Sequence, residues 1–473
     1  MPSRPILKLK DELKTGQHPG ISWGQIPLWE LGENVKFSAT GPKKIKGWSS
    51  PIATGTGSTP VRGISQNLGG TQQLFWGDQT TLYFWNTVSV STPGTGFTGI
   101  EDATVIAPAT QWSFAPFGSW MLATNGVDLP QVYKGASFAA LDVDSQFTTA
   151  EIFIARGPHI IAMNTSVNGK EFVWCDTGDV EDWLATASNA AGSLIIREAQ
   201  SDIVAGAPLG ESVMAYTKED SYRISYVGSP NTFGYKPAAT GIGAVSKHSV
   251  ISVGRQNFGW GREGLWVTDG VSARYIDESV RDYLNDNVNF SQISKVCGYH
   301  DEENKAVVWY YQSTSSTNDV DRGISYNYED GTWALLSYGR TSVAERNVFD
   351  YPLSADASGE IFYDNFGNDA DGSALSAWIR TKPMDGDVAD LIKEIESIRV
   401  AYKGSGLTYR FGYQEEQDDA VAWGNYQEID SGFSFSDDRL SGRYITLELY
   451  SDQVGDSWDV SRIDVYGYAS GER

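Results

Sequence analysis

Hydrophobic and polar positions alternate in short runs along most of this 473-residue chain, and turn residues separate the runs. Two apolar runs flank Gly77-Asp78 within residues 73–86, and the same arrangement surrounds Asn125-Gly126 and Asn168-Gly169. Glycine, asparagine and aspartate adopt the backbone angles of tight turns at little cost, so each pair predicts a β-hairpin. Further hairpins are predicted around Glu219-Asp220, Asp269-Gly270 and Asp330-Gly331.

The spacing of these turns predicts a repeated architecture. Successive turns between Asn125 and Asp330 lie 43 to 61 residues apart, near the period of about 40–50 residues of propeller blades. We therefore expect a mainly β protein in which residues 61–375 form a divergent β-propeller; a pair of β-sandwiches is the competing architecture. Residues 376–473 predict a smaller antiparallel β-sandwich-like domain, because apolar and polar residues alternate cleanly in 407–413, 444–450 and 460–468.

Residues 1–60 show a different pattern, because seven prolines interrupt every candidate element. This segment predicts an extended N-terminal interaction arm. Its aromatic residues, which cannot be buried by an isolated arm, should dock on this subunit or on a neighbour: Trp23, Trp29, Phe37 and Trp48. Apolar residues at helical spacing predict short packing helices at 277–287 and 387–395.

Composition excludes two broad classes of protein. The 16 Trp, 24 Tyr and 19 Phe residues supply enough apolar surface for a core, so the chain is not intrinsically disordered. Its 60 acidic and 36 basic residues give a formal charge of −24, and static nucleic-acid binding needs the opposite balance. Residues 1–50 carry eight basic and four acidic side chains, which leaves −28 for the remainder. Ordinary solubility is the simplest explanation of such an acidic surface.

Residues that could carry chemistry are sparse. Cys175 and Cys297 lie far apart and outside any CxxC spacing, which favours two buried thiols over a disulfide or a zinc site. The four histidines occur singly: His18, His159, His248 and His300. Neither a histidine metal motif nor a phosphate-binding loop is present in the sequence. We therefore expect no enzymatic activity, no catalytic or metal-binding residues and no cofactor.

The N-terminal residues have basic side chains without the apolar stretch of a secretory signal, and no run of 18 apolar residues occurs. We expect a protein made in the cytoplasm and without a membrane-spanning segment.

Five stretches together are similar to one family. They are ATNGVDLPQVYKG at 123–135, FVWCDTGDVEDW at 172–183, VMAYTKEDSYRISYVGSP at 213–230, GREGLWVTDG at 261–270 and RGISYNYEDGTW at 322–333. Their order resembles that of the packaged-DNA stabilisation proteins, or tail nozzles, of short-tailed bacteriophages. The resemblance covers residues 110–340, extends loosely over the C-terminal domain, and hardly includes the arm.

The resemblance implies a structural virion protein of the phage tail. It implies a propeller-like subunit in a homo-oligomeric ring, a hexamer, below the portal and adaptor rings of the head–tail connector. Such a ring extends the DNA channel, retains packaged DNA, conducts double-stranded DNA at ejection, and binds the tail needle and the tail fibres or spikes. The family supplies no catalytic residues.

The charge balance fits such a conduit, because carboxylate walls repel phosphates whereas lysine and arginine bind them. We hypothesise that many of the acidic side chains line the channel. The basic residues of the arm would then bind an acidic neighbouring subunit, so partner-binding residues are predicted at Arg4, Lys8, Lys10 and Lys14.

A second hypothesis comes from a different class of protein. A carbohydrate-binding or glycan-cleaving β-propeller, such as a phage receptor-binding protein, would use tryptophan rings as platforms for sugars. Glycan cleavage needs two carboxylates flanking the scissile bond, and no pair stands out among the 60 acids.

Overall fold

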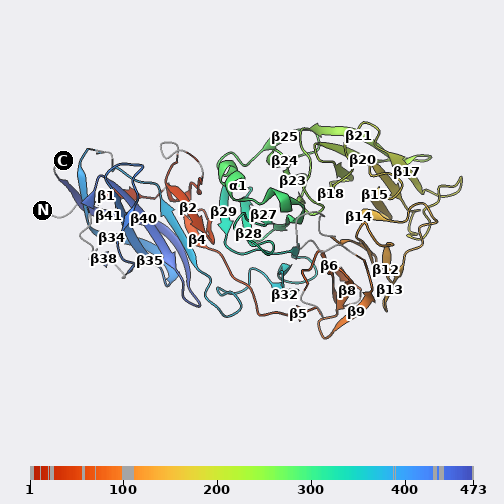
Figure 1. Cartoon of the computed structure of the whole chain (residues 1–473), viewed down its shortest axis with the longest axis horizontal. Coiled ribbons are helices and arrows are strands. Elements are labelled where there is room, and N and C mark those ends of the chain that lie inside the picture. Colours follow the sequence, from red (N-terminus) through yellow and green to blue (C-terminus); the bar gives the residue numbers. More distant parts are fainter. Residues whose placement is uncertain are drawn as a thin grey trace.

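The computed structural model describes residues 5–10, 12–19, 21, 26–55, 59–69, 71–98, 111–386, 388, 390–429, 434–435 and 441–470. The described residues are mainly β, as predicted, and helices are few and short. Figure 1 shows a β-sandwich at one end of the molecule and a ring of small sheets at the other.

Seven four-stranded antiparallel sheets, here called blades, lie within the described part of the chain. The first three are β6 (Ile64–Leu68), β7 (Gln72–Gly77), β8 (Thr81–Trp85) and β9 (Val90–Thr95); β10 (Ser113–Phe117), β11 (Trp120–Thr124), β12 (Gln131–Tyr133) and β13 (Phe138–Ala140); and β14 (Ala150–Arg156), β15 (His159–Thr165), β16 (Glu171–Trp174) and β17 (Gly192–Ile195).

The next three blades continue in chain order. They are β18 (Ala205–Leu209), β19 (Ser212–Tyr216), β20 (Asp220–Gly228) and β21 (Thr232–Thr240); β22 (Val250–Val253), β23 (Gln256–Gly261), β24 (Gly264–Thr268) and β25 (Ala273–Tyr275); and β26 (Cys297–Asp301), β27 (Ala306–Tyr311), β28 (Arg322–Asn327) and β29 (Thr332–Leu336). The seventh combines β30 (Ser342–Ala344), β31 (Leu353–Ala355) and β32 (Glu360–Tyr363) with β5 (Ala53–Thr54).

The blades form a closed ring. The first strand of each blade contacts the first strand of the next, and β30 of the seventh blade contacts β6 of the first. This cycle of contacts is the arrangement of a β-propeller, with the first strands around the axis. Because β5 precedes the first blade in sequence but pairs with β32 of the last, the two ends of the propeller segment are joined by backbone hydrogen bonds.

Hydrophobic clusters hold neighbouring blades together. Phe75 of the first blade packs against Tyr133 of the second, with ring centroids 5.1 Å apart. Trp174 of the third blade meets Phe233 of the fourth at 5.5 Å. A small sheet buries its apolar faces only against other sheets, so each blade depends on its neighbours for a core.

The predicted hairpins around Gly77-Asp78, Asn125-Gly126 and Asn168-Gly169 are confirmed as turns between the second and third strands of the first three blades. In the second of these turns, the Asn125 side-chain oxygen accepts hydrogen bonds from the backbone N–H groups of Val127 and Asp128, at 3.0 and 2.8 Å. Gly126 adopts φ +82°, which a residue with a Cβ rarely takes.

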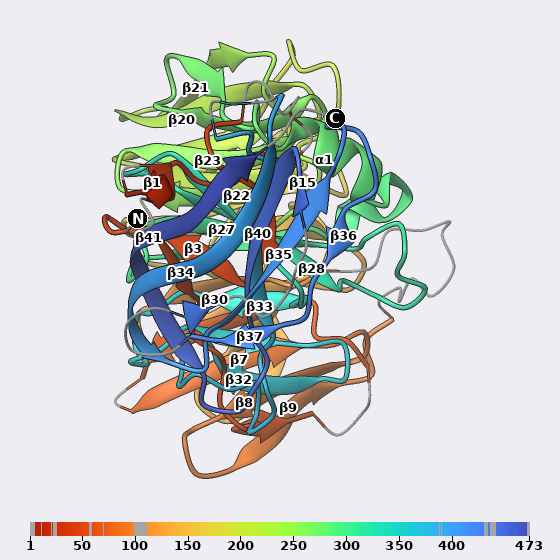
Figure 2. The ribbon, with the colours of Figure 1, turned by 90° about the vertical axis from the view of Figure 1, so that its left-hand side faces the viewer.

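The sandwich consists of two sheets around one hydrophobic core. One sheet contains β1 (Pro5–Leu9), β3 (Val35–Phe37), β4 (Pro42–Lys44), β34 (Ile392–Ser405), β38 (Ser434–Phe435), β39 (Ser441–Gly442) and β41 (Ser457–Ser470). The other contains β2 (Trp29–Glu33), β33 (Ala377–Thr381), β35 (Thr408–Gln414), β36 (Ala422–Trp423), β37 (Gln427–Glu428) and β40 (Tyr444–Ser451). Figure 2, seen from this end, shows the long strands β34 and β41 in front of the blades.

The N-terminal segment differs from the predicted arm. Its strands β1, β2 and β4 pair with strands from the C-terminal part of the chain, β3 pairs with β4, and β5 belongs to the last blade. Its described aromatic residues dock on the same chain, since Trp29 and Phe37 are buried in the sandwich core and Trp48 packs on Tyr338; Trp23 lies outside the described residues. The prolines interrupt local elements, but they do not prevent pairing with strands more than 300 residues away.

One of the two predicted helices is confirmed. Helix α1 (Arg281–Asn287) lies within 277–287, and the buried Asp277 that precedes it pairs with Arg281 at 2.7 Å. Short 3-10 turns occur at Glu12–Lys14 and Phe290–Lys295. The prediction for 387–395 is wrong from Ile392 onward, because that part begins β34, which pairs along its length with β41. This long-range pairing outweighs the local helical spacing.

Candidate binding cavity on the propeller axis

A cavity of about 810 Å³ opens at one end of the propeller axis. Its walls are loops from four successive blades, β10–β13 to β22–β25, together with the 3-10 turn that precedes β26. The lining residues are of two kinds: turns between the second and third strands of a blade, and segments that lead into a first strand. The propeller therefore brings together residues that are separated by up to 183 positions in the chain.

Two carboxylates occupy equivalent places in this wall. Glu151, the second residue of β14, lies against Gly126 of the preceding blade, and Asp202, just before β18, lies against Gly169 of its preceding blade. A Cβ added to Gly126 or Gly169 would come within 2.3 Å of the respective carboxyl group. Glycine at these turns therefore leaves the space that each carboxyl group occupies.

Lys247 crosses the inner end of the cavity. Its ammonium donates to the carbonyl of Gln111 at 2.6 Å and pairs with Glu151 at 2.8 Å, and its side chain is only 8% exposed. The same lysine lines a second cavity of about 220 Å³, which is bounded by the first strands of four blades. Lys247 therefore separates the two cavities along the axis.

The neighbouring residue His248 also reaches across to the second blade. Its Nε2 lies 2.9 Å from the carbonyl oxygen of Trp112. Burial, with a smaller contribution from the charge of Lys247, lowers the pKa of His248 to about 4. The imidazole is therefore neutral near pH 7, and its Nε2–H donates to the carbonyl.

A buried ion cluster involves charged side chains that do not line the cavity. Arg62, which leads into β6, binds Asp319 of the β27–β28 loop through two hydrogen bonds of 2.6 and 3.2 Å. Lys295 lies 3.9 Å from the same carboxylate, and both cationic side chains are almost fully buried. The cluster joins the first blade to the sixth, and its two buried cations share one carboxylate.

Both cysteines are buried and unpaired, as predicted. Burial raises the pKa of each thiol to about 12, so neither is a reactive thiolate near neutral pH. No group of three or more His, Cys, Asp or Glu side chains that could hold a metal ion occurs among the described residues.

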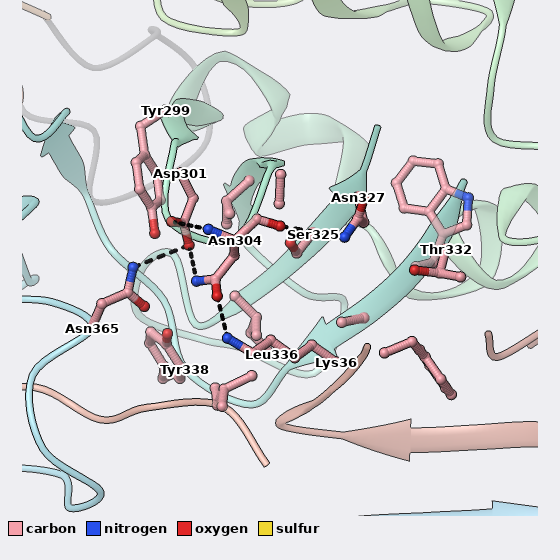
Figure 3. A pocket seen from close by; sticks show the side chains of 16 residues that line it. Lys36, Tyr299, Asp301, Asn304, Ser325, Asn327, Thr332, Leu336, Tyr338 and Asn365 are labelled. Carbon is pink, nitrogen blue, oxygen red and sulfur yellow. Dashed lines mark hydrogen bonds between the residues drawn. The ribbon is translucent and has the colours of Figure 1, made fainter. Parts of the chain in front are cut away.

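A much smaller pocket, of about 40 Å³, lies at the seam between sandwich and propeller. Figure 3 shows Lys36 of β3 reaching toward Asn304 of the sixth blade, where its ammonium donates to the side-chain oxygen. Asn304 and Asn365 both donate to the Asp301 carboxylate, at 2.6 and 3.1 Å. Burial, partly opposed by the charge of Asp301, lowers the pKa of Lys36 to about 8. This pocket is filled by the contacts that fix one domain on the other.

The predicted partner-binding residues lie elsewhere. Arg4 is outside the described residues, whereas Lys8, Lys10 and Lys14 are exposed near the β1 edge of the sandwich. The structure brings these three lysines close together in a short segment and keeps them apart from the axial cavity.

Sequence reasoning identified the turns at Asn125-Gly126 and Asn168-Gly169 but not the cavity beside them. The available signal was the recurrence of a carboxylate 25 residues after the first turn glycine and 33 residues after the second. That signal has meaning only once consecutive blades are placed side by side.

No known sequence family and no curated protein matches this chain. Solved structures that are similar in part include three different proteins. PorZ, a surface component of the type-IX secretion system of Porphyromonas gingivalis, has 7% identity and a TM-score of 0.40 over 71% of this chain. The match covers 45% of the PorZ chain, so this protein spans less than half of that length.

The second structure is U3-55K, with 7% identity and a TM-score of 0.38 over 66% of this chain and 97% of its own. The third is the extracellular domain of the one-component system BT4673 from B. thetaiotaomicron, with 11% identity and a TM-score of 0.35 over 86% of this chain and 47% of its own. These likenesses are too distant to bear on function.

Within the described residues, no helix has the length and apolar character needed to cross a bilayer.

Proposed function

We propose that this chain is a structural subunit of a phage tail nozzle: a homo-oligomeric ring, a hexamer, that extends the DNA channel below the portal and adaptor, retains packaged DNA and conducts it at ejection. The observation that carries the proposal is the succession of the five nozzle-like stretches. They lie on the second to sixth blades in turn, one on each, at or beside the central strands. The resemblance therefore follows the blade order of the propeller.

The propeller axis supports a particular route for the DNA. Lys247 and His248 cross the axis through hydrogen bonds to the second blade, so a duplex does not pass through a single propeller. In the proposed ring the channel lies between subunits, along their outer surfaces. Outside residues 1–50 these surfaces belong to a segment of net charge −28, and carboxylates repel a polyanion.

The basic edge of the sandwich supports the proposed contact with a neighbouring subunit. Lys8, Lys10 and Lys14 are exposed there, while the loop 415–419 of the same domain contributes four acidic residues. The portal or adaptor, the tail needle and the fibres or spikes are the further partners in this proposal, and the virion tail is the location.

Electron microscopy of the purified full-length chain tests the ring, because class averages should show closed rings of about six subunits. A filter-binding assay on the same preparation should find no retention of double-stranded DNA at physiological salt. A strictly monomeric protein, or one that retains duplex DNA tightly, contradicts the proposal.

Charge reversal tests the basic edge. Lys8→Glu combined with Lys10→Glu leaves the buried Leu9 in place and should reduce ring formation. Lys403→Glu, at an exposed position near the end of β34, is the matched control. If the double variant and the control assemble equally well, the lysines do not form the contact.

A further inference from the structure

The geometry points to a binding site for a neutral oligosaccharide in the axial cavity of about 810 Å³. This inference does not depend on the ring, because all the residues involved belong to one propeller. The volume is within the range of about 300–1,000 Å³ that small-ligand sites occupy.

The charges of the lining residues exclude a strongly anionic ligand. Lys247 is neutralised by Glu151 at 2.8 Å, and Arg262 lies 3.7 Å from Glu219 at the rim. The charged lining residues that remain are Lys218 and Asp202, which are of opposite sign. A phosphate or a polyanionic sugar would find no group of uncompensated cations, so a neutral ligand fits best.

Several polar side chains in the cavity wall have free hydrogen-bonding capacity and can bind the hydroxyl groups of a ligand. Among the described residues, the Asp202 carboxylate forms no hydrogen bond or ion pair, and it can accept two hydroxyl hydrogens. Asn164 uses its amide N–H to hold the carbonyl of Ile203 at 2.8 Å, which leaves its side-chain oxygen as an acceptor. Lys218 supplies a donor. A sugar, whose hydroxyl groups both donate and accept hydrogen bonds, is complementary to this set.

An exposed aromatic ring completes the site. Phe290 lines the cavity and is 50% exposed, so its ring is accessible to a ligand. The face of an aromatic ring is apolar and pairs with the C–H face of a pyranose. Val127, 42% exposed, adds apolar surface at the same mouth.

The test uses the full-length chain on an array of neutral, sialylated and phosphorylated oligosaccharides, followed by calorimetric titration of the best ligand. The wild type should bind neutral glycans. Asp202→Asn and Phe290→Ala should each lower affinity about tenfold, since each removes one hydrogen-bonding or stacking partner. Asp330→Asn, at an exposed acid in the turn between β28 and β29, should bind as the wild type does.

Binding of no neutral glycan, binding of charged glycans alone, or undiminished affinity in both cavity variants would overturn the inference. Circular dichroism of the variants shows that lost affinity is not lost folding, since Asp202 and Phe290 are both exposed. The ring proposal is judged separately by particle size: a monomer that binds the glycan contradicts the nozzle and supports the site, and a ring that binds none does the reverse.

Discussion

Truncating Trp29 to alanine distinguishes a structural N-terminal segment from a dispensable arm. The indole is fully buried between the two sheets of the sandwich, and its Nε1–H donates to the carbonyl of Leu13 at 3.1 Å. Removing a buried tryptophan costs about 3–5 kcal/mol, and the orphaned carbonyl adds about 1 kcal/mol. We expect Trp29→Ala to destabilise the sandwich by about 4 kcal/mol or more.

Urea unfolding followed by far-ultraviolet circular dichroism measures this loss, and hydrogen exchange assigns it to a domain, because a two-domain chain need not unfold in one step. For a denaturant slope near 2 kcal/mol/M, the sandwich transition should fall by about 2 M. Protection should be lost in β33, β40 and β41 while the blades keep theirs.

Lys10→Ala is the control, since this exposed residue lies in the same segment and should change stability by less than about 0.5 kcal/mol. Equal transitions for Trp29→Ala, Lys10→Ala and the wild type would refute the argument, because residues 1–60 would then behave as an arm that contributes nothing to the core.

Three further predictions concern buried charges. Asp319→Asn leaves Arg62 and Lys295 without their shared carboxylate, so the free energy of unfolding should drop by about 3–5 kcal/mol; an unchanged thermal midpoint would contradict this. His248 has a pKa lowered to about 4. Its contribution to the free energy of unfolding should therefore be fully present above pH 6.5 and decrease toward pH 4, by at most about 1.4 kcal/mol per pH unit. His248→Asn should flatten that part of the urea-midpoint profile. Lys36 has a pKa lowered to about 8, so its contribution to stability should rise between pH 8 and 10.5, by at most about 1.4 kcal/mol per pH unit. Lys36→Met should remove that rise, which is measured by comparing urea midpoints at pH 7.5 and 9.5.

The hydrogen bonds of Lys247 and His248 across the propeller axis limit where a DNA channel can lie. The sequence suggests acidic walls, but it cannot say whether those walls belong to one propeller or to several subunits. Lys247 and His248 bridge to the second blade and block the axis at the inner end of a ligand-sized cavity, so a DNA channel would have to lie outside the single propeller.

Local chemistry in the sequence was enough to determine the strands and many of their turns. Asn125-Gly126 turns because the asparagine side chain binds the following backbone and glycine takes a positive φ, and both effects act within four residues. The burial of Cys175 and Cys297 could also be predicted, because two cysteines far apart in the sequence and outside any CxxC spacing are more often buried thiols than a disulfide or a zinc site.

Tertiary structure alone decided the features that depend on distant partners. Residues 392–395 have helical spacing yet form a strand because β41 offers a complete edge of backbone groups. The local sequence of segment 1–60 is typical of an extended arm. In the folded protein, its strands pair with β33, β41 and β32, which lie hundreds of residues later in the chain. The axial cavity also depends on distant residues. Asp202, Lys218 and Phe290 line one cavity only because the blades pack side by side in the propeller, and no local sequence pattern predicts which blades are neighbours.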